Sequence, residues 1–309
     1  MAQKKQRKNP GTENSDNRTM GTTQLLTYGL YQIEGSFNAL FARAFRTTEK
    51  DLALAFEAML DGWQLNHSTT RQRVRLRTAY LIDYGNIKPG PTAVYENRIQ
   101  ITSAGSPRHI TDYTFQIDKA GLKPGQTFYE WKDGEITRTD AEGNTVSVTE
   151  FPSNVAASKQ FTLIVEVIRS NPNGDPHRGG KPRQDDDGHG LYGSCAIKRM
   201  IRRYGNLLHG QELYMHEGAD LAEVASKSKF PTKEAMLDAF WDMRLFGQGM
   251  PTFGRNGAGP LNICIGWTID QGEWFTVTMT CVAKHNGESA ESFIEEPELL
   301  GAPVVAEAK

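Results

Sequence analysis

Basic side chains recur along one arc of a predicted helix in SCAIKRMIRRYGNLL, residues 194–208. The apolar positions, at helical spacing, are Ile197, Ile201, Tyr204 and Leu208. The opposite arc carries Lys198, Arg199, Arg202 and Arg203. Because no acidic residue in this stretch offsets their charge, we expect the arc to contact the phosphates of a nucleic-acid backbone. A solvated, charged helix face is the alternative interpretation.

A polar loop, SNPNGDPHRGG, precedes this helix and follows the apolar run FTLIVEVI. The run is predicted to be a central strand that is covered on at least one face. The two prolines of the loop restrict the residues before them to extended geometry, and Gly174 can adopt a positive φ. Asn171 and Asn173 can bond backbone groups or a ligand. The loop is therefore predicted to be rigid, either as an ordinary Asn-Gly turn or as part of a ligand site.

A second basic segment lies earlier in the chain, where arginine alternates with other residues in RQRVRLRT. On an extended strand, Arg71, Arg73, Arg75 and Arg77 would share one face. Because the segment contains no acids to pair with them, we expect this face to meet phosphates. The alternative is a solvated edge strand whose charges oppose aggregation.

Carboxylates and imidazoles gather in DDDGHG, residues 185–190, with His177 nearby. Such groups can hold a divalent metal, but adjacent acids point in different directions unless the fold gathers them. We therefore favour a solvated loop. The three cysteines are widely spaced and indicate neither a disulfide framework nor a metal-ligand pair. No cofactor, metal ligand or catalytic residue is predicted.

Several further elements would position these groups. An amphipathic helix is predicted to begin after Thr47 or Thr48 and to end near Gly62. A second helix is predicted over residues 232–250, TKEAMLDAFWDMRLFGQGM, with Arg244 and Gln248 near its glycine-rich end. The stretch from 129 to 154 predicts a β-hairpin around AEGN and then a linker.

Composition and charge limit the class of protein. The chain has 309 residues and a net charge of −2, with a basic start and an acidic end that both look like mobile tails. Its near-neutral charge excludes a generic polyanion binder. No apolar run approaches the ~20 residues of a membrane span, and the first residues lack the apolar core of a signal peptide. With few cysteines, the sequence predicts a cytoplasmic protein.

Two sets of long motifs occur in the chain. The later set comprises NPNGDP after an apolar strand, the basic helix CAIKRMIRRY, then FWDMRLFGQ and AGPLNICIGWTID. The earlier set comprises NRTMGTTQLLTYGLYQIEGSF, TTEKDLALAFEAMLDGWQLNHSTTR and HITDYTFQID. The later set resembles the N-terminal half of the CRISPR-associated Cas-seven family, in particular the backbone subunit of type I-C Cascade. The earlier set resembles the C-terminal half of that family, so the chain looks like a circular permutation.

The resemblance implies an α+β fold with an RRM-like (ferredoxin-like) antiparallel palm and helical and irregular finger and thumb insertions. Its strand-helix-strand-strand-helix-strand order places the last strand beside the first, so a short connector can join the usual termini. The parts so implied are a disordered basic tail (1–20), a palm part (21–115), a hairpin and linker joining the usual termini (116–160), the palm and fingers (161–285), and an acidic mobile tail (286–309).

The function implied is that of a non-catalytic subunit whose copies line up along a CRISPR RNA and present its bases to target DNA. Contacts are expected to the RNA backbone and sugar. The RNA-binding residues so implied are Arg18, Met20, Arg71, Arg73, Asn171, Asn173, Lys198, Arg199, Arg202, Arg203, Arg244 and Gln248. The implied partners are CRISPR RNA, target DNA through the guide, other copies of the subunit and other Cascade subunits, with no membrane.

Two alternatives remain open. An RNA-cleaving backbone subunit like those of type III complexes predicts metal-dependent cuts that are lost on Asp175→Ala, Asp185→Ala or Asp187→Ala. An assembly module that has lost RNA binding predicts that substituting the basic helix leaves assembly with RNA unchanged. The hairpin at 128–150 matches no part of the family to which a role can be assigned.

Overall fold

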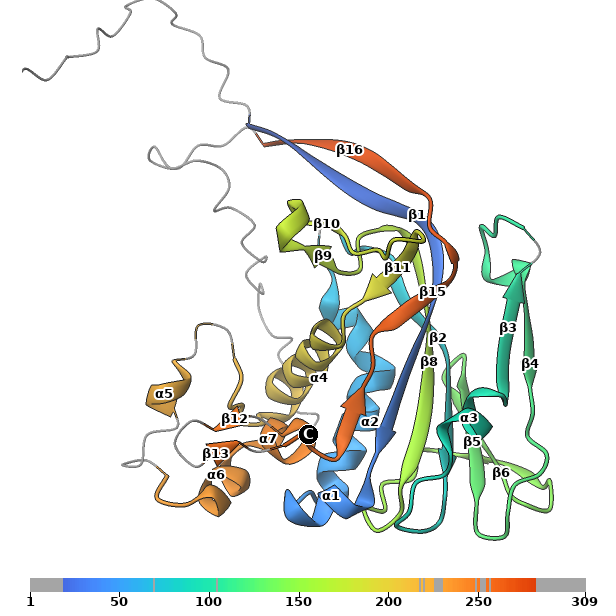
Figure 1. Ribbon diagram of the computed structural model, residues 1–309, viewed down its shortest axis with the longest axis vertical. Coiled ribbons are helices and arrows are strands. Elements are labelled where there is room, and N and C mark those ends of the chain that lie inside the picture. Colours follow the sequence, from blue (N-terminus) through green and yellow to red (C-terminus); the bar gives the residue numbers. More distant parts are fainter. Residues whose placement is uncertain are drawn as a thin grey trace, which may run out of the picture. The chain divides into compact units, whose positions relative to one another are not determined.

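The computed structural model describes residues 19–68, 70–103, 105–216, 218, 220–224, 230–247, 249–250, 254–255 and 257–281. Within these residues the chain is mixed α+β and contains a large antiparallel sheet (Figure 1). The main path of the sheet runs β11 (His189–Tyr192), β15 (Gly266–Gln271), β1 (Thr19–Phe37), β8 (Lys159–Ser170), β2 (Val74–Asp83), β5 (Thr127–Lys132), β6 (Glu135–Thr139) and β7 (Thr145–Val148). Two further strands, β14 (Leu261–Ile263) and β16 (Trp274–Cys281), also pair with β1. The predicted α+β class is confirmed.

The chain divides into two compact units. The larger unit spans Gln24–Phe275 and contains all the side chains whose contacts are described below. The smaller unit combines Met1–Thr23 with Thr276–Lys309. Within it, the structure describes the outer ends of β1 and β16, residues 19–23 and 276–281.

The central strand is β8, which pairs with β1 on one side and β2 on the other. Nearly every residue of β8 is buried, so the predicted central strand is confirmed. Its odd-numbered apolar residues, such as Phe161 and Val165, face one core, and Ile164 faces another. Alternation of this kind is what a pleated strand produces when both of its faces are covered.

Two helices, α2 (Glu49–Asp61) and α4 (Ser194–His209), pack against one face of the sheet (Figure 1). The predicted start of α2 is confirmed, because the Thr48 hydroxyl accepts a hydrogen bond from the Asp51 N–H and the Asp51 carboxylate accepts one from the Thr48 N–H. Gly62 is the C-cap, as predicted. The short helix α1 (Ala39–Ala44) precedes α2, and η1 (Gly62–Asn66) follows it.

The opposite face of the sheet is covered by a hairpin and two short helices. These are β3 (Ile99–Ser103), β4 (Tyr113–Ile117), α3 (Thr92–Glu96) and η2 (Ile110–Asp112). They enclose a second core that contains aromatic side chains from the sheet, including Tyr28, Tyr80 and Phe128. These rings are therefore buried and are not available for stacking against a ligand.

The helix predicted over residues 232–250 is wrong as a single element. The structure has α6 (Lys233–Ala239) and α7 (Trp241–Phe246), which are separated by an extended Phe240 at φ −108° and ψ 114°. Phe240 packs into a small core with Met236, whereas Trp241 packs into the main core beneath the sheet. Consecutive residues of one helix are only ~100° apart around its axis. The break allows these two neighbours to enter different cores. The short helix α5 (Leu221–Val224) precedes this pair.

The segment from 116 to 160, predicted to be a hairpin and a linker, contains one more strand of the sheet than expected. The hairpin around AEGN is present as β6 and β7, but β5 pairs with both β6 and β2 and so joins all three strands to the sheet. Asp133 and Gly134 connect β5 to β6 with positive φ values of 51° and 89°. A two-residue loop with φ positive at both positions matches the twist of a tight hairpin.

Candidate nucleic-acid interface

The Asn-Pro-Asn-Gly loop after β8 is held rigid by its own hydrogen bonds. Asn171 is buried, and its side chain donates to the Gly180 carbonyl at 2.8 Å and accepts from the Asn173 N–H at 3.2 Å. The loop contains η3 (Pro176–Arg178), and its two arms pair as β9 (Gly174–Asp175) and β10 (Lys181–Pro182). These hydrogen bonds would oppose movement of the loop, as the prediction of a rigid turn requires, and the Asn171 side chain is committed to the loop itself.

Asn173 lies beside the start of α4. A Cβ on Gly193, the N-cap residue of α4, would come within 3.3 Å of the Asn173 Oδ1. The Asn173 Nδ2 is buried and has no hydrogen-bond partner among the described residues. No side chain caps α4 at this end, so its first backbone N–H groups and the positive end of its dipole lie next to the loop. The geometry favours a negatively charged or hydrogen-bond-accepting ligand here.

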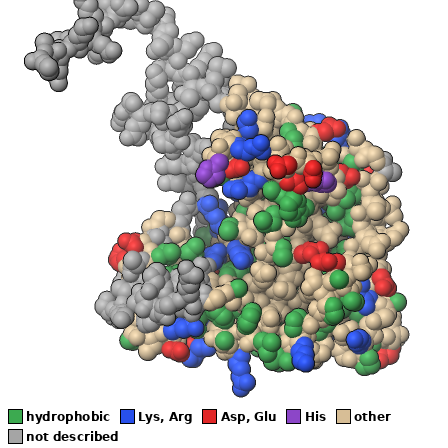
Figure 2. Space-filling view, in the orientation of Figure 1, with side chains coloured by type: hydrophobic (Ala, Val, Ile, Leu, Met, Phe, Trp, Pro, Cys, Tyr) green, Lys and Arg blue, Asp and Glu red, His purple; other side chains and the backbone are tan. Residues whose placement is uncertain are grey.

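Basic side chains continue from the loop onto α4. In Figure 2, Lys and Arg side chains follow one another from the region of β9 and β10 down over α4, with acidic side chains beside the upper part. Arg199 is exposed, and Lys198 and Arg203 are half-buried. The Lys198 ammonium lies 5.5 Å from the centre of the Phe246 ring, and burial lowers the pKa of Lys198. A phosphate beside Lys198 would favour its charged form.

Arg202 does not share the exposed arc, which corrects the prediction for this residue. It is only 9% exposed, and its Nε lies 2.7 Å from the Oδ2 of the fully buried Asp242. Asp242 also accepts hydrogen bonds from the backbone N–H groups of Tyr214 and Met215. This pair therefore ties α4 to α7 and to the chain between them. The acid that offsets Arg202 comes from another helix, so the local sequence gave no sign of it.

The predicted all-guanidinium face at residues 71–77 is also wrong. The strand begins only at Val74, and a register shift between Leu76 and Thr78 interrupts its alternation. Because of this shift, the apolar side chains of Leu76 and Ala79 both face the main core. The shift also places Arg77 against Glu166. The Arg77 Nε donates to the buried Glu166 Oε2 at 2.8 Å. Arg77 therefore pairs with an acid of the central strand.

Arg71 and Arg73 precede β2 and lie beside the loop. The Asn171 N–H donates to the Thr70 carbonyl at 2.7 Å, and the exposed Arg73 donates its backbone N–H to the Ser170 hydroxyl. The Arg71 Nη1 donates to Asn66 at 3.1 Å. The start of β2 and the exit of β8 are thus held together, as RNA contact by both segments would require.

Additional basic residues of the loop were missed in the sequence. Arg178 and Lys181 are exposed at the tip of the β9–β10 turn, while Arg183 donates from Nε to the Gly174 carbonyl at 3.2 Å and so stabilises the loop. The motif HRGGKPR contained the signal, because it places further cations directly after a stiff polar turn. We define the strand-exit surface as Arg71, Arg73, Asn173, Arg178, Lys181, Lys198, Arg199 and Arg203.

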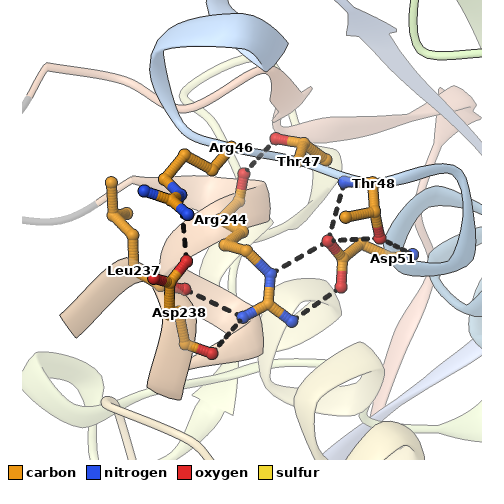
Figure 3. A network of polar contacts seen from close by, with 7 residues as sticks. All are labelled: Arg46, Thr47, Thr48, Asp51, Leu237, Asp238 and Arg244. Carbon is orange, nitrogen blue, oxygen red and sulfur yellow. Dashed lines mark hydrogen bonds and ion pairs between the residues drawn. The ribbon is translucent and has the colours of Figure 1, made fainter. Parts of the chain in front are cut away.

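Arg244 lies elsewhere, in a network of polar contacts that joins α7 to α2 (Figure 3). Its Nε and Nη2 donate to the two carboxylate oxygens of Asp51 at 2.9 and 2.7 Å, and its Nη1 donates to the carbonyls of Leu237 and Asp238. These bonds occupy most of the donors of a guanidinium. Arg244 therefore has a structural role in this network, and its contact with RNA stays a prediction.

The structure gives no side-chain contacts for the remaining three predicted RNA-binding residues. Arg18 and Gln248 lie outside the described residues, and Met20 lies in β1 with a side chain that is not described. In the acidic loop, Asp175 accepts the His177 N–H and Asp185 accepts the His189 N–H. Among the described residues no group of three or more His, Cys, Asp or Glu side chains is arranged to hold a metal ion.

Comparison with known proteins gives the family. The sequence profile of the family described as CRISPR-associated protein Cas7 matches residues 1–118 and 157–307. These segments make up most of the chain, which therefore belongs to the Cas7 family of CRISPR-associated proteins. Searches of curated proteins and of solved structures gave no significant match.

Membership in this family suggests a backbone subunit of a CRISPR antiviral-defence complex, with CRISPR RNA and other Cas subunits as partners. The residues between the two matched segments, 119–156, contain β5, β6 and β7. Within the described part of the chain, no helix is both long and apolar enough to span a membrane.

Proposed function

We propose that this protein is a non-catalytic, cytoplasmic backbone subunit of a type I-C-like Cascade complex, which grips guide RNA through the strand-exit surface. The observation that carries the proposal is the run of Lys and Arg side chains from the β9–β10 turn onto α4 (Figure 2). Family membership supplies the partner, because Cas7 proteins act with CRISPR RNA. Several copies would line the guide, and its exposed bases would pair with target DNA.

The form of the basic surface favours contacts to the RNA backbone. Arg199, Arg178 and Lys181 are exposed, and charged donors of this kind neutralise phosphates without distinguishing bases. The uncapped start of α4 adds backbone N–H groups suited to a phosphate. Base recognition by the opposite sheet face is disfavoured, because the rings of Tyr28 and Tyr80 are buried beneath β3 and β4. The guide would therefore lie along the loop and helix.

The palm is proposed to be an RRM-like unit that begins at its usual third strand. In such a fold, two strand-helix-strand units interleave, so each helix connects strands that have another strand between them. Here α2 connects β1 to β2 with β8 between them, and α4 lies between β8 and β15 with β1 between those strands. Read from β8, the order is strand, helix, strand, strand, helix, strand. This order, together with the two sets of motifs, supports a circular permutation.

The connector of the permuted chain would be the segment that contains β5, β6 and β7. It follows β4, where the family motifs of the earlier set end, and precedes β8, where those of the later set begin. The family profile leaves out residues 119–156, which lie within the proposed connector, 116–160. A segment that joins the usual termini would have no counterpart in family members of the usual order.

The test is RNA binding by a variant in which Lys198, Arg199 and Arg203 are replaced by Ala. Arg202 stays unchanged, because its removal would disturb the buried Asp242. A matched control replaces the exposed Lys88, Lys123 and Lys132 by Ala, which removes the same charge elsewhere.

The readouts are the nucleic acid that copurifies with each protein and the salt dependence of single-stranded RNA binding. Each lost phosphate contact should reduce the slope of log K against log salt by ~0.7, so the helix variant should lose roughly 2 units and the control should keep the wild-type slope. Equal binding by wild type and helix variant, or no RNA on wild type expressed with a guide and partner subunits, would refute the proposal. The second result would favour the assembly module.

Lack of catalysis is part of the proposal and has its own test. Asp175 and Asp185 each accept a backbone N–H within their own turns, which gives these two carboxylates a structural use. Incubating the protein with guide-complementary RNA and Mg²⁺ should leave the RNA intact. Cleavage that disappears on Asp175→Ala, Asp185→Ala or Asp187→Ala would establish the type III-like alternative instead.

A further inference from the structure

Arg169, near the end of the central strand β8, has a left-handed backbone with a φ of 46°. Residues other than glycine seldom adopt such a φ, because their Cβ comes too close to the following carbonyl oxygen. Two other non-glycine residues in the described part of the chain share this sign of φ, and each has a local reason. Asp133 lies in the tight turn between β5 and β6, and Arg46 lies just past the end of α1. Of the three, only Arg169 lies within a strand.

Arg46 shows what a left-handed residue ordinarily does. The Thr47 N–H donates to the Ala42 carbonyl at 3.0 Å, and the Arg46 N–H donates to the Arg43 carbonyl at 3.3 Å. This is the Schellman motif, in which a left-handed residue satisfies the last carbonyls of a helix. Arg169 ends no helix, so its backbone conformation requires a different explanation.

The backbone on both sides of Arg169 is fixed by the residue that precedes β2. The Ile168 N–H donates to the Arg73 carbonyl at 3.0 Å, and the Arg73 N–H donates to the Ser170 hydroxyl at 3.1 Å. The same hydroxyl donates to the Ile168 carbonyl at 2.9 Å and so bridges the residues that flank Arg169. A strained backbone persists where its surroundings hold it in this way, and such positions cluster at ligand sites.

The left-handed conformation interrupts the alternation of β8. The odd-numbered residues before it, Val165 and Val167, are buried in the main core, and regular alternation would continue that face. Arg169 is instead exposed, while Ser170 and Asn171 after it are both buried. Its side chain makes no hydrogen bond or ion pair with any described residue. The strand irregularity therefore presents a guanidinium to solvent, and irregularities that redirect a side chain are common beside functional sites.

We propose that Arg169 contacts a phosphate of the guide RNA and that its strained backbone aims the guanidinium at that phosphate. The inference rests on the proposed function and adds one residue to the strand-exit surface. Arg169 lies directly before Ser170 and the Asn-Pro-Asn-Gly loop, and the residues on either side of it bond to Arg73 of that surface. A guanidinium can donate to two oxygens of one phosphate. A structural arginine pairs with a carboxylate of the protein instead, as Arg202 and Arg244 do.

The experiment separates the guanidinium from the strain, in the full-length protein. Arg169→Ala removes the charge and keeps a Cβ at the strained position, Arg169→Gly removes both, and Arg169→Lys keeps a positive charge. Arg46→Gly is the matched control, because it removes another exposed, left-handed arginine, at the end of α1. The readouts are the thermal midpoint and the salt dependence of binding to oligo(A) and oligo(U) RNA.

Arg169→Ala and Arg169→Gly should each lower the slope of log K against log salt by ~0.7. The loss should be equal for the two RNAs, because a phosphate contact carries no sequence information. Arg169→Lys should keep most of the slope, and Arg46→Gly should keep all of it. Arg169→Gly should also raise the thermal midpoint by ~1–4 °C, because glycine adopts this φ without strain. A gain in stability together with a loss of RNA binding is not what a merely structural arginine would give.

An unchanged slope in Arg169→Ala and Arg169→Gly would overturn the inference, and the proposed function would stand if the Lys198, Arg199 and Arg203 variant still lost its contacts. Equal binding by that helix variant and wild type would overturn the proposed function itself. A loss with only one of the two RNAs would overturn the phosphate contact in favour of a base contact. If Arg169→Gly does not fold, Arg169→Ala decides the matter, since it changes only an exposed side chain.

Discussion

Replacing Arg244 by Ala should destabilise the protein strongly without weakening RNA binding by the folded molecule. The side chains of Arg244 and Asp51 are 14% and 6% exposed, and they meet through two hydrogen bonds of 2.9 and 2.7 Å (Figure 3). Breaking a buried ion pair from one side costs ~3–5 kcal/mol, because the remaining charge stays buried. The carbonyls of Leu237 and Asp238 lose a donor as well. We therefore expect a loss of ~3–5 kcal/mol in the free energy of unfolding.

The same network provides the control and a double-mutant cycle. Arg46 pairs with Asp238 at 2.9 Å, but both side chains are more than half exposed, so Arg46→Ala should cost less than ~1 kcal/mol. Asp51→Ala loses the ion pair and the capping box of α2 together. On that background, Arg244→Ala should cost ~1 kcal/mol or less, which gives a coupling of at least ~2 kcal/mol.

The assay is urea unfolding followed by tryptophan fluorescence, together with thermal midpoints. At ~2–4 °C per kcal/mol, Arg244→Ala should lower the midpoint by roughly 6–20 °C. The structural assignment would be refuted if Arg244→Ala unfolded within ~1 kcal/mol of wild type and bound RNA less well. That result would restore the RNA-binding role predicted for Arg244 from the sequence.

Three further predictions concern α4 and its surroundings. Arg202→Ala should lower the free energy of unfolding by ~3–5 kcal/mol, because Asp242 is left buried and unpaired. Arg199→Ala, at an exposed position, should change it by less than ~1 kcal/mol, and the urea midpoints of the two variants check this difference. Gly205→Ala should destabilise the protein by ~1–3 kcal/mol despite the better helix propensity of Ala, because its Cβ would lie 2.3 Å from the ring of the buried Trp241. A melting temperature at or above that of wild type would contradict this. Burial raises the pKa values of Tyr80, Tyr84 and Tyr192 to about 12. Because the unfolded chain releases these phenol protons at lower pH than the folded one, the free energy of unfolding should fall as pH rises from 10 towards 12. Unfolding midpoints measured through this range should fall less steeply in Tyr192→Phe than in wild type.

The sequence was most informative where one local pattern determined the structure. Thr48, the apolar stripe after it and Gly62 defined α2, because caps and periodicity act within a few residues. The rigid turn at Asn171 was predictable for the same reason, since prolines and glycines limit the backbone directly. The exposed cations of α4 also follow from helical spacing alone.

The errors arise where residues distant in sequence meet. Arg202, Arg244 and Arg77 looked unpaired because their acids, Asp242, Asp51 and Glu166, lie on other elements. A count of charges within one segment cannot reveal such partners. The break at Phe240 has a similar origin, since two separate cores attract neighbouring side chains and override helix propensity.

The central position of β8 has a consequence for how the chain folds during synthesis. Both of its sheet partners, β1 and β2, leave the ribosome first, yet these two strands are not paired with each other along the main path of the sheet. Until Lys159–Ser170 has been made, the edges of β1 and β2 that β8 will occupy remain open, and open edges invite association between chains. The nascent chain should therefore depend on chaperones most strongly just before β8 emerges. A chain that began at β8 would form the same sheet with its centre made first.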